Sequence, residues 1–261
     1  MEQSNRRCPQ RPCRHRLRCL KRHLCYNIFM KIRKSSERGR FDYGWLNTQH
    51  TFSFGDYQDP ANTHFRSLRV INEDYVQAGM GFPTHAHRDM EIVTFIIAGE
   101  LEHKDSLGNG SVIRPGDVQR MSAGTGVTHS EFNPSAKNPT HLLQLWIFPE
   151  KNNLKPSYEQ KNFSSQMKKE GLVLLASGDP QGGAVKIHQD AGIYHGLLKA
   201  KGKMVYEAKV GRGIWIQMIS GKVDISKNTL EPGDGAALEK ETKIEIAAPD
   251  EECRFLLFDL Q

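Results

Sequence analysis

At 261 residues, the chain can bury one large hydrophobic core or two modest ones. Its hydrophobic content of 38% and charged content of 25% are typical of globular proteins. No apolar run approaches the roughly 20 residues that a membrane-spanning helix needs, so we expect no membrane segment. The net charge of +6 belongs to residues 1–29, which carry +7, and the remaining residues sum to −1. The nearly neutral charge of residues 30–261, the body of the chain, argues against specific binding of nucleic acid.

Residues 1–29 differ from the rest of the chain in charge and in cysteine content. They hold eight Lys or Arg residues, one acidic residue and four of the five cysteines. They lack the apolar core of a secretory signal, and their cysteine spacing misses the close pairs of most structural zinc sites. We interpret them as a basic, disordered extension, or as the result of a start codon assigned too early, ahead of Met30. An organelle presequence and a zinc-binding tail are the alternatives.

Cysteine usage also bears on the cellular compartment. Cys253 is the one cysteine that follows residue 29. A body with a single thiol has no disulfide framework, which is typical of proteins in a reducing compartment. We therefore expect a cytoplasmic location.

From residue 40 onward, short apolar runs alternate with Gly, Pro, Asn and Asp every 8–12 residues. This spacing predicts an all-β sandwich or barrel, and long helical periodicity is nearly absent. The expected strands are Ser67–Asn72, Ile92–Ala98, Gly110–Ile113, His141–Phe148, Gly213–Ile219, Lys222–Ile225 and Cys253–Leu260.

One passage occurs twice along the chain. Phe95–Gly99 is an apolar run closed by glycine, and Pro-Gly-Asp follows it within Arg114–Asp117. Met218–Gly221 and Glu231–Asp234 repeat this order. Pro-Gly-Asp is a natural turn into a strand, so its recurrence after the same kind of strand suggests a repeated barrel.

The stretch between the two passages suggests where the chain divides. Residues 149–170 are polar and rich in Lys, Asn and Ser, and we interpret them as a linker. After the extension over 1–29, we therefore expect a first domain over 30–150, a linker over 151–170 and a second domain over 171–261.

Two short segments carry metal-binding side chain types at positions i and i+2. Thr84-His85-Ala86-His87 offers two histidines, and Thr128-His129-Ser130-Glu131 offers a histidine and a glutamate. On a strand, such residues point to the same face, roughly 6–7 Å apart at Cα. Neither pair can surround an ion alone, but two such strands inside one barrel supply four ligands. Imidazoles with one carboxylate suit Fe, Mn, Co, Ni, Cu or Zn rather than Ca or Mg.

The arrangement Gly79-x₅-His85-x-His87-x₃-Glu91, followed by Gly126-x₂-His129-x₃-Asn133, resembles the two motifs of the cupin superfamily. From about residue 30 to the C-terminus, the sequence is similar to the pirin family, which is one family of the cupin superfamily. The segments that carry this resemblance are Gly44–Leu46, His50–Phe54, Leu68–Asn72, Ser122–Gly126 and His129–Glu131.

The resemblance implies a bicupin fold with one metal ion, usually iron, in the N-terminal barrel. It implies that the ligands are His85, His87, His129 and Glu131, and that the second barrel is a degenerate cupin without a metal site. Glu91 lies one residue early for the cupin glutamate, and a one-residue slip along a strand turns a side chain to the opposite face. We therefore do not count Glu91 among the ligands.

The other histidines are weaker candidates. His50, within the His-Thr-Phe-Ser-Phe stretch, is a possible pocket residue. We expect His64, His103 and His141 to be solvent-facing or structural, and His188 and His195 to be packing or surface residues.

Three functions fit this reading. Some bacterial pirins resemble quercetin 2,3-dioxygenases, which implies an oxidoreductase that cleaves a flavonol-like substrate with O₂, with Glu131 as general base. Mammalian pirin is regarded as an iron-dependent transcriptional co-regulator, which implies a non-enzymatic iron-binding redox sensor with a protein partner. A cupin acting on an unrelated small molecule is the third, because fold and metal do not fix the substrate. We expect Fe(II) as the cofactor, with Zn, Ni, Cu, Mn or Co as alternatives.

Overall fold

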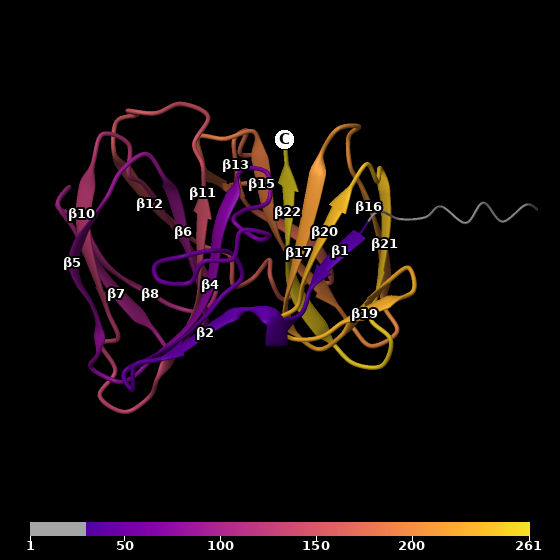
Figure 1. Cartoon of the computed structure of the whole chain (residues 1–261), viewed down its shortest axis with the longest axis horizontal. Coiled ribbons are helices and arrows are strands. Elements are labelled where there is room, and N and C mark those ends of the chain that lie inside the picture. The colour runs from indigo at the N-terminus through magenta and orange to yellow at the C-terminus, as the bar shows by residue number, and fades with distance from the viewer. Residues whose placement is uncertain (1–29) are drawn as a thin grey trace, which may run out of the picture.

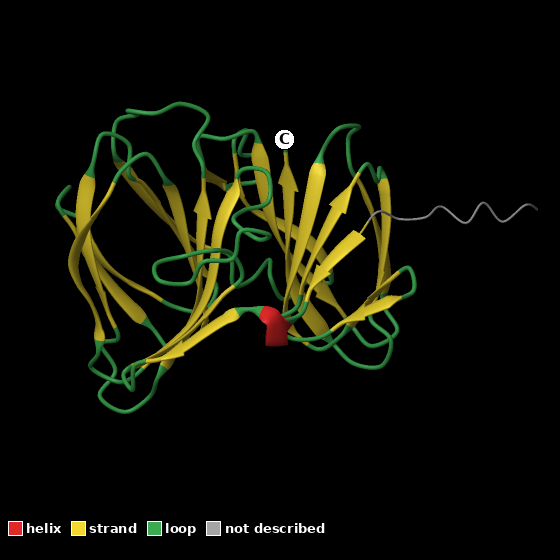
Figure 2. Ribbon diagram, in the orientation of Figure 1, coloured by secondary structure: helices red, strands yellow, loops and turns green. Residues whose placement is uncertain are grey.

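The computed structural model describes residues 30–261, so the interpretations of residues 1–29 lie outside the described residues. Two β-barrels stand side by side, with the earlier part of the chain in one and the later part in the other (Figure 1). The regular elements of the described range are strands, together with the short 3-10 helix η1 (Ser35–Glu37) that lies between the barrels (Figure 2). The prediction of an all-β, two-barrel chain is confirmed. No helix in this range has the length and apolar character to span a membrane.

The first barrel encloses its interior between a seven-stranded and a four-stranded sheet. In spatial order, the larger sheet contains β12 (Ser157–Asn162), β9 (Asp117–Ser122), β6 (Glu91–Ala98), β11 (Thr140–Ile147), β4 (Leu68–Val76), β3 (Leu46–His50) and β2 (Gly39–Asp42). The smaller sheet contains β5 (Gly81–His87), β10 (Val127–Phe132), β7 (Leu101–Asp105) and β8 (Gly110–Ile113).

The second barrel has the same construction. Its larger sheet contains β1 (Met30–Arg33), β20 (Gly235–Glu239), β17 (Gly213–Ser220), β22 (Cys253–Leu260), β15 (Ala191–Leu198), β13 (Gly171–Ser177) and β14 (Val185–Lys186). Its smaller sheet contains β16 (Lys203–Glu207), β21 (Lys243–Ala247), β18 (Val223–Ile225) and β19 (Asn228–Leu230).

The repeated passage occupies equivalent places in the two barrels. In the first, β6 ends at a turn through Gly99, and Pro-Gly-Asp leads into β9, which pairs with β6. In the second, β17 ends at a turn through Gly221, and β20 pairs with β17. Both glycines have positive φ, and a Cβ on either would lie within 2.7 Å of a backbone carbonyl oxygen. Glycine is therefore required at both turns.

The strands expected from the sequence are present, and their ends differ by a few residues. The largest difference is β4, expected to end at Asn72 but continuing to Val76 through Glu73 and Asp74. These acidic residues look like strand breakers in the sequence. In the fold, Glu73 is held by an ion pair with Arg38 at 2.8 Å and a contact with His141 at 2.8 Å. Paired in this way, the carboxylate is tolerated within a sheet.

Two expected domain limits do not match the strand pairing. The linker expected over 151–170 contains β12, which adds to the first barrel as an edge strand beside β9. The first domain was expected to begin at residue 30, but β1 pairs with β20 of the second barrel. The strand β12 could not be predicted from its polar sequence, because an edge strand with half-exposed side chains needs no alternation of apolar and polar residues. Each barrel therefore receives a strand from outside its own expected range.

A shared hydrophobic core joins the barrels. It combines first-barrel residues such as Phe52 and Leu143 with second-barrel residues such as Trp215 and Phe258. The rings of Phe52 and Trp215 lie 5.0 Å apart, and both side chains are buried. Because aromatic burial of this kind excludes water from the contact, the barrels pack as a unit.

Candidate metal centre

The two motifs predicted to carry chemistry lie on neighbouring strands of the smaller sheet of the first barrel. His85 and His87 lie on β5, and His129 and Glu131 lie on β10. The strands are antiparallel, with His129 directly opposite His85. Since side chains at i and i+2 share a face, this register places all four residues on the side of the sheet that faces the barrel interior.

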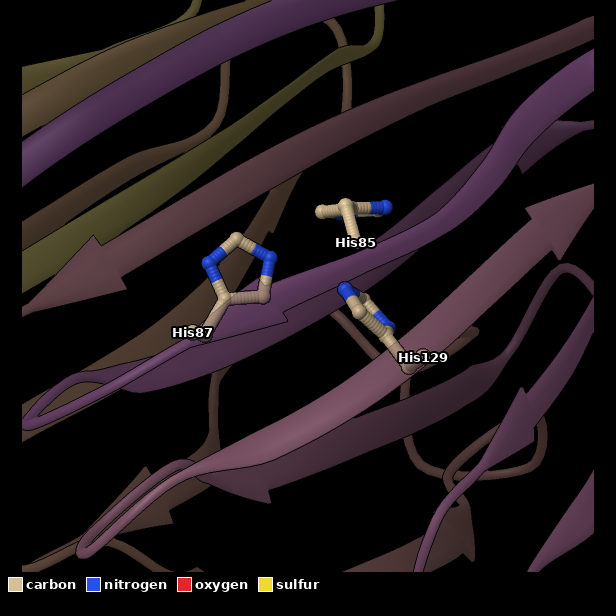
Figure 3. Close-up of side chains that lie close together, drawn as sticks. All are labelled: His85, His87 and His129. Carbon is tan, nitrogen blue, oxygen red and sulfur yellow. The ribbon is translucent and has the colours of Figure 1, made fainter.

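The three imidazoles converge on one another, as Figure 3 shows. Their ring centroids are separated by 4.4 Å between His85 and His129, and by 4.8 Å for each of the other two pairs. One ring nitrogen from each histidine lies within 4.8 Å of the other two. Three nitrogens at this spacing can bind a single ion placed between them.

Hydrogen bonding assigns the free nitrogens of this cluster. Nδ1 of His85 lies 2.8 Å from the carbonyl oxygen of Pro83, which can only accept, so Nδ1 carries a proton and Nε2 is the nitrogen that the neutral ring offers to a metal. Nε2 of His129 is buried and has no hydrogen-bond partner within the described chain. A buried ring nitrogen without a partner is costly unless something binds it, and a metal ion would.

The electrostatics of the cluster also suit a cation site. Burial, with a smaller contribution from the neighbouring His85, lowers the pKa of His87 to about 4. Burial, followed by repulsion from the surrounding histidines, lowers the pKa of His129 to about 2. Both rings are therefore neutral at pH 7, which is the form that coordinates metal. The donor set fits one divalent transition metal ion.

Glu131 occupies a slightly different place from the other three residues. The pairing of β10 with β5 shifts register between His129 and Glu131, so that Glu131 faces Phe82. Its carboxylate falls in a second, overlapping cluster with His129 and His103, in which the ligand atoms lie within 4.8 Å of one another. The structure thus brings the three predicted histidines together and places Glu131 beside His129. Its role as fourth ligand stays a prediction.

Glu131 is buried and has an unusual ionisation. Desolvation raises its pKa to about 7, against a lowering effect of the hydrogen bond from Gln144 on β11. Negative charge on Asp74 adds to the rise. A carboxyl group that titrates near pH 7 can take up or release a proton under physiological conditions.

His103 was expected to be solvent-facing or structural, and it is fully buried behind His129. It lies on β7, its ring centroid is 5.2 Å from that of His129, and Nε2 contacts Asp105 at 3.2 Å. Burial lowers the pKa of His103 more than Asp105 raises it, so the ring is neutral. The alternation of Leu101, His103 and Asp105 with Glu102 and Lys104 was a signal that could have revealed this buried face.

His50, the possible pocket residue, is buried but does not touch the three histidines. It reaches them through a line of aromatic contacts: His50 with Phe54 at 5.1 Å, Phe54 with Trp146 at 5.3 Å, and Trp146 with His87 at 4.9 Å. Burial, with the charge of Arg38, lowers its pKa to about 4. A pocket role for His50 stays a prediction.

Glu91 faces away from the cluster, as the one-residue slip predicted. Its buried carboxylate accepts hydrogen bonds from Ser122 at 2.9 Å and from the backbone N–H of His188 at 3.1 Å. His188 belongs to the second barrel, so this carboxylate fastens the barrels together. His195 is buried and stacks on Phe95 at 6.2 Å, which is a packing role.

Comparison with known proteins agrees with this geometry. Residues 31–147 match the family model described as Pirin, and residues 174–260 match the quercetinase C-terminal cupin domain. The chain is 44% identical over 229 residues to quercetin 2,3-dioxygenase of Escherichia coli, covering 88% of this chain and 97% of the relative. It is 39% identical over 235 residues to a putative quercetin 2,3-dioxygenase of Pasteurella multocida, covering 88% and 99%.

Solved structures also resemble this chain along most of its length. YhhW from Escherichia coli superposes with a TM-score of 0.86 at 44% identity, covering 89% of this chain and 97% of that one. The same bacterial pirin has been solved in complex with nickel(II), with a TM-score of 0.84 at 43% identity, covering 88% and 98%. With matches along most of both barrels, this chain belongs to the pirin family.

Proposed function

We propose that this protein is a metal-dependent quercetin 2,3-dioxygenase that cleaves quercetin or a related flavonol with O₂. The observation that carries the proposal is the convergence of three imidazoles beside the buried carboxylate of Glu131. Relatives at 39–44% identity that bear this enzyme name support the choice of substrate. The ligands we propose are His85, His87, His129 and Glu131.

The residues of the chain suggest how a flavonol would be activated. A divalent metal at this position supplies Lewis acidity that lowers the pKa of a coordinated hydroxyl group. Glu131, with a pKa of about 7, would take that proton at a carboxylate oxygen. Gln144 holds the carboxylate by donating from Nε2 at 3.0 and 3.3 Å. Glu131 itself is buried, which limits the access of bulk water to its carboxylate.

Fe(II) is the metal that we propose, because imidazole and carboxylate donors suit it and the pirin resemblance favours it. Nickel is the alternative favoured by the nickel complex of the bacterial pirin. A cytoplasmic location, expected from the single body cysteine, is part of the same proposal.

The test is aerobic incubation of metal-analysed protein with quercetin, monitoring flavonol absorbance and carbon monoxide release. Separate samples loaded with Fe(II), Ni(II) or Zn(II) rank the metals, and chelated protein is the blank. Loss of flavonol absorbance with carbon monoxide release, in proportion to bound metal, is the expected result. No turnover by any metal form would contradict the proposed activity.

A further inference from the structure

Asp105 is a buried carboxylate behind the histidine cluster, and both of its oxygens are occupied. Oδ1 accepts from the backbone N–H groups of Leu107 at 2.9 Å and Asn109 at 3.0 Å. The side-chain amide of Asn109 donates to Oδ2 at 2.9 Å and to Oδ1 at 3.1 Å. These contacts keep Asp105 as an acceptor and fix Oδ2 toward His103.

The next contact determines where the proton lies on His103. Nε2 of His103 is 3.2 Å from Oδ2 of Asp105, and an ionised carboxylate can only accept. Nε2 of His103 therefore carries hydrogen. A neutral imidazole has one N–H, so Nδ1 of His103 is left as an acceptor.

The same reasoning extends to His129. Nδ1 of His129 lies 3.4 Å from Nδ1 of His103, and one of the two must donate. Because His103 accepts there, His129 is the donor, and its lone pair lies on Nε2. This is the buried nitrogen that has no partner within the described residues.

We propose that Asp105 acts through His103 to hold His129 in the Nδ1–H tautomer, which leaves Nε2 available to the metal. His103 and Asp105 are positioning residues: one residue, His129, lies between His103 and the ion, and two lie between Asp105 and the ion. His85 achieves the same result with one backbone carbonyl, that of Pro83. The inference rests on the proposed metal site and is independent of the substrate.

Asp105→Asn is the sharpest test, because the surroundings decide how the new amide sits. Two backbone N–H groups require an oxygen at the Oδ1 position, so the amide nitrogen takes the place of Oδ2. It then donates to Nε2 of His103, which moves the proton of His103 to Nδ1. His129 is forced into the Nε2–H form, and its free nitrogen is lost.

Two measurements follow on metal-free protein. The ¹⁵N shifts of the His129 ring should report Nδ1–H in wild type and Nε2–H in Asp105→Asn. Calorimetric titration with Ni(II) should show about 10–100-fold weaker binding, the usual cost of losing an outer partner of a metal ligand. Asp42→Asn is the matched control, since Asp42 also accepts from a turn N–H, that of Gly44 at 2.8 Å, outside the cluster. It should change neither reading.

A second variant keeps the test decisive if Asp105→Asn folds poorly. His103→Phe keeps a ring beside Tyr158 but removes the acceptor, so His129 should populate both tautomers and bind Ni(II) more weakly. In the double variant, the asparagine should add nothing to the loss caused by His103→Phe. Additive losses, or wild-type His129 shifts with unchanged Ni(II) affinity in Asp105→Asn, would overturn the proposal. Absence of quercetin turnover would leave these readings untouched.

Discussion

The side-chain amide of Gln144 donates to both carboxylate oxygens of Glu131, at 3.0 and 3.3 Å. Its own oxygen accepts from the hydroxyl of Thr94 at 3.0 Å, which fixes the amide with its nitrogen toward the carboxylate. This hydrogen bond favours the ionised form of Glu131, whereas burial and the charge of Asp74 favour the protonated form. The pKa of about 7 is the balance of these opposing effects.

That balance predicts opposite effects for two substitutions. Gln144→Leu removes the bond to the ionised carboxylate, so the pKa of Glu131 should rise and the acidic limb of the kcat/KM profile should move up by ~1 pH unit. Asp74→Asn removes a repelling charge, so the same limb should move to lower pH. The measurement is quercetin turnover from pH 5 to 9. Shifts in the same direction for both variants would contradict Glu131 as the base.

Metal content should depend on the histidines of the cluster individually. His85→Ala and His129→Ala each remove one proposed ligand, and each should lose most of the bound metal from a chain that otherwise holds about one ion. His64→Ala is the control, because His64 is exposed and lies outside both clusters. Elemental analysis after purification checks the result. Full metal content in the His85→Ala/His129→Ala double variant would refute the assignment.

The sequence could predict the histidine cluster because strand alternation is a local rule. His85 and His87 must share a face wherever their strand goes, and so must His129 and Glu131. The convergence of the two pairs additionally required the barrel, which the repeated Gly and Pro-Gly-Asp passage and the pirin resemblance supplied.

Contacts that depend on the register of distant strands could not be predicted in this way. Gln144 reaches Glu131 from β11, and Asp74 lies on β4, which pairs with β11 residue by residue. Nothing in the sequence fixes that register. The pairing of β1 with the second barrel could not be predicted either, because a strand of four residues is too short for its sequence to indicate which strand it pairs with.

Strand β1 should contribute measurably to stability despite its length. It pairs with β20 along its four residues, and Arg33 donates to Asp59 of the first barrel at 3.0 Å. A chain that begins at Lys34 should therefore melt at least about 5 °C below one that begins at Met30, because the lost backbone hydrogen bonds are worth roughly 1 kcal/mol each.

Deletion of residues 1–29 alone is the control for this comparison, and it should leave both melting temperature and metal content unchanged. Differential scanning calorimetry gives the melting temperatures of the full chain and of the two truncated chains, and elemental analysis gives their metal content. Equal melting of the two truncated chains would mean that β1 is dispensable. A drop on removal of residues 1–29 would contradict our interpretation of that segment.

The last prediction separates the two roles proposed for Glu131. Glu131→Gln keeps the volume and one coordinating oxygen but removes the group that titrates near pH 7. If Glu131 is the base, Glu131→Gln should lower turnover roughly 10²–10⁴-fold while quercetin binding is retained. As a ligand, it must lose its proton before metal binds, so wild-type affinity for Ni(II) should fall as pH drops below 7.

In the variant that fall should be shallower, because the titrating carboxyl group is gone and His87 and His129 stay neutral down to about pH 4 or lower. Ni(II) titrations at pH 5.5, 6.5 and 7.5, with turnover measured on the same preparations, give both answers. Parallel pH dependence in wild type and Glu131→Gln would remove Glu131 from the ligand set. Equal turnover at equal metal content would exclude it as the base, and each role can fail without the other because affinity and turnover are measured separately.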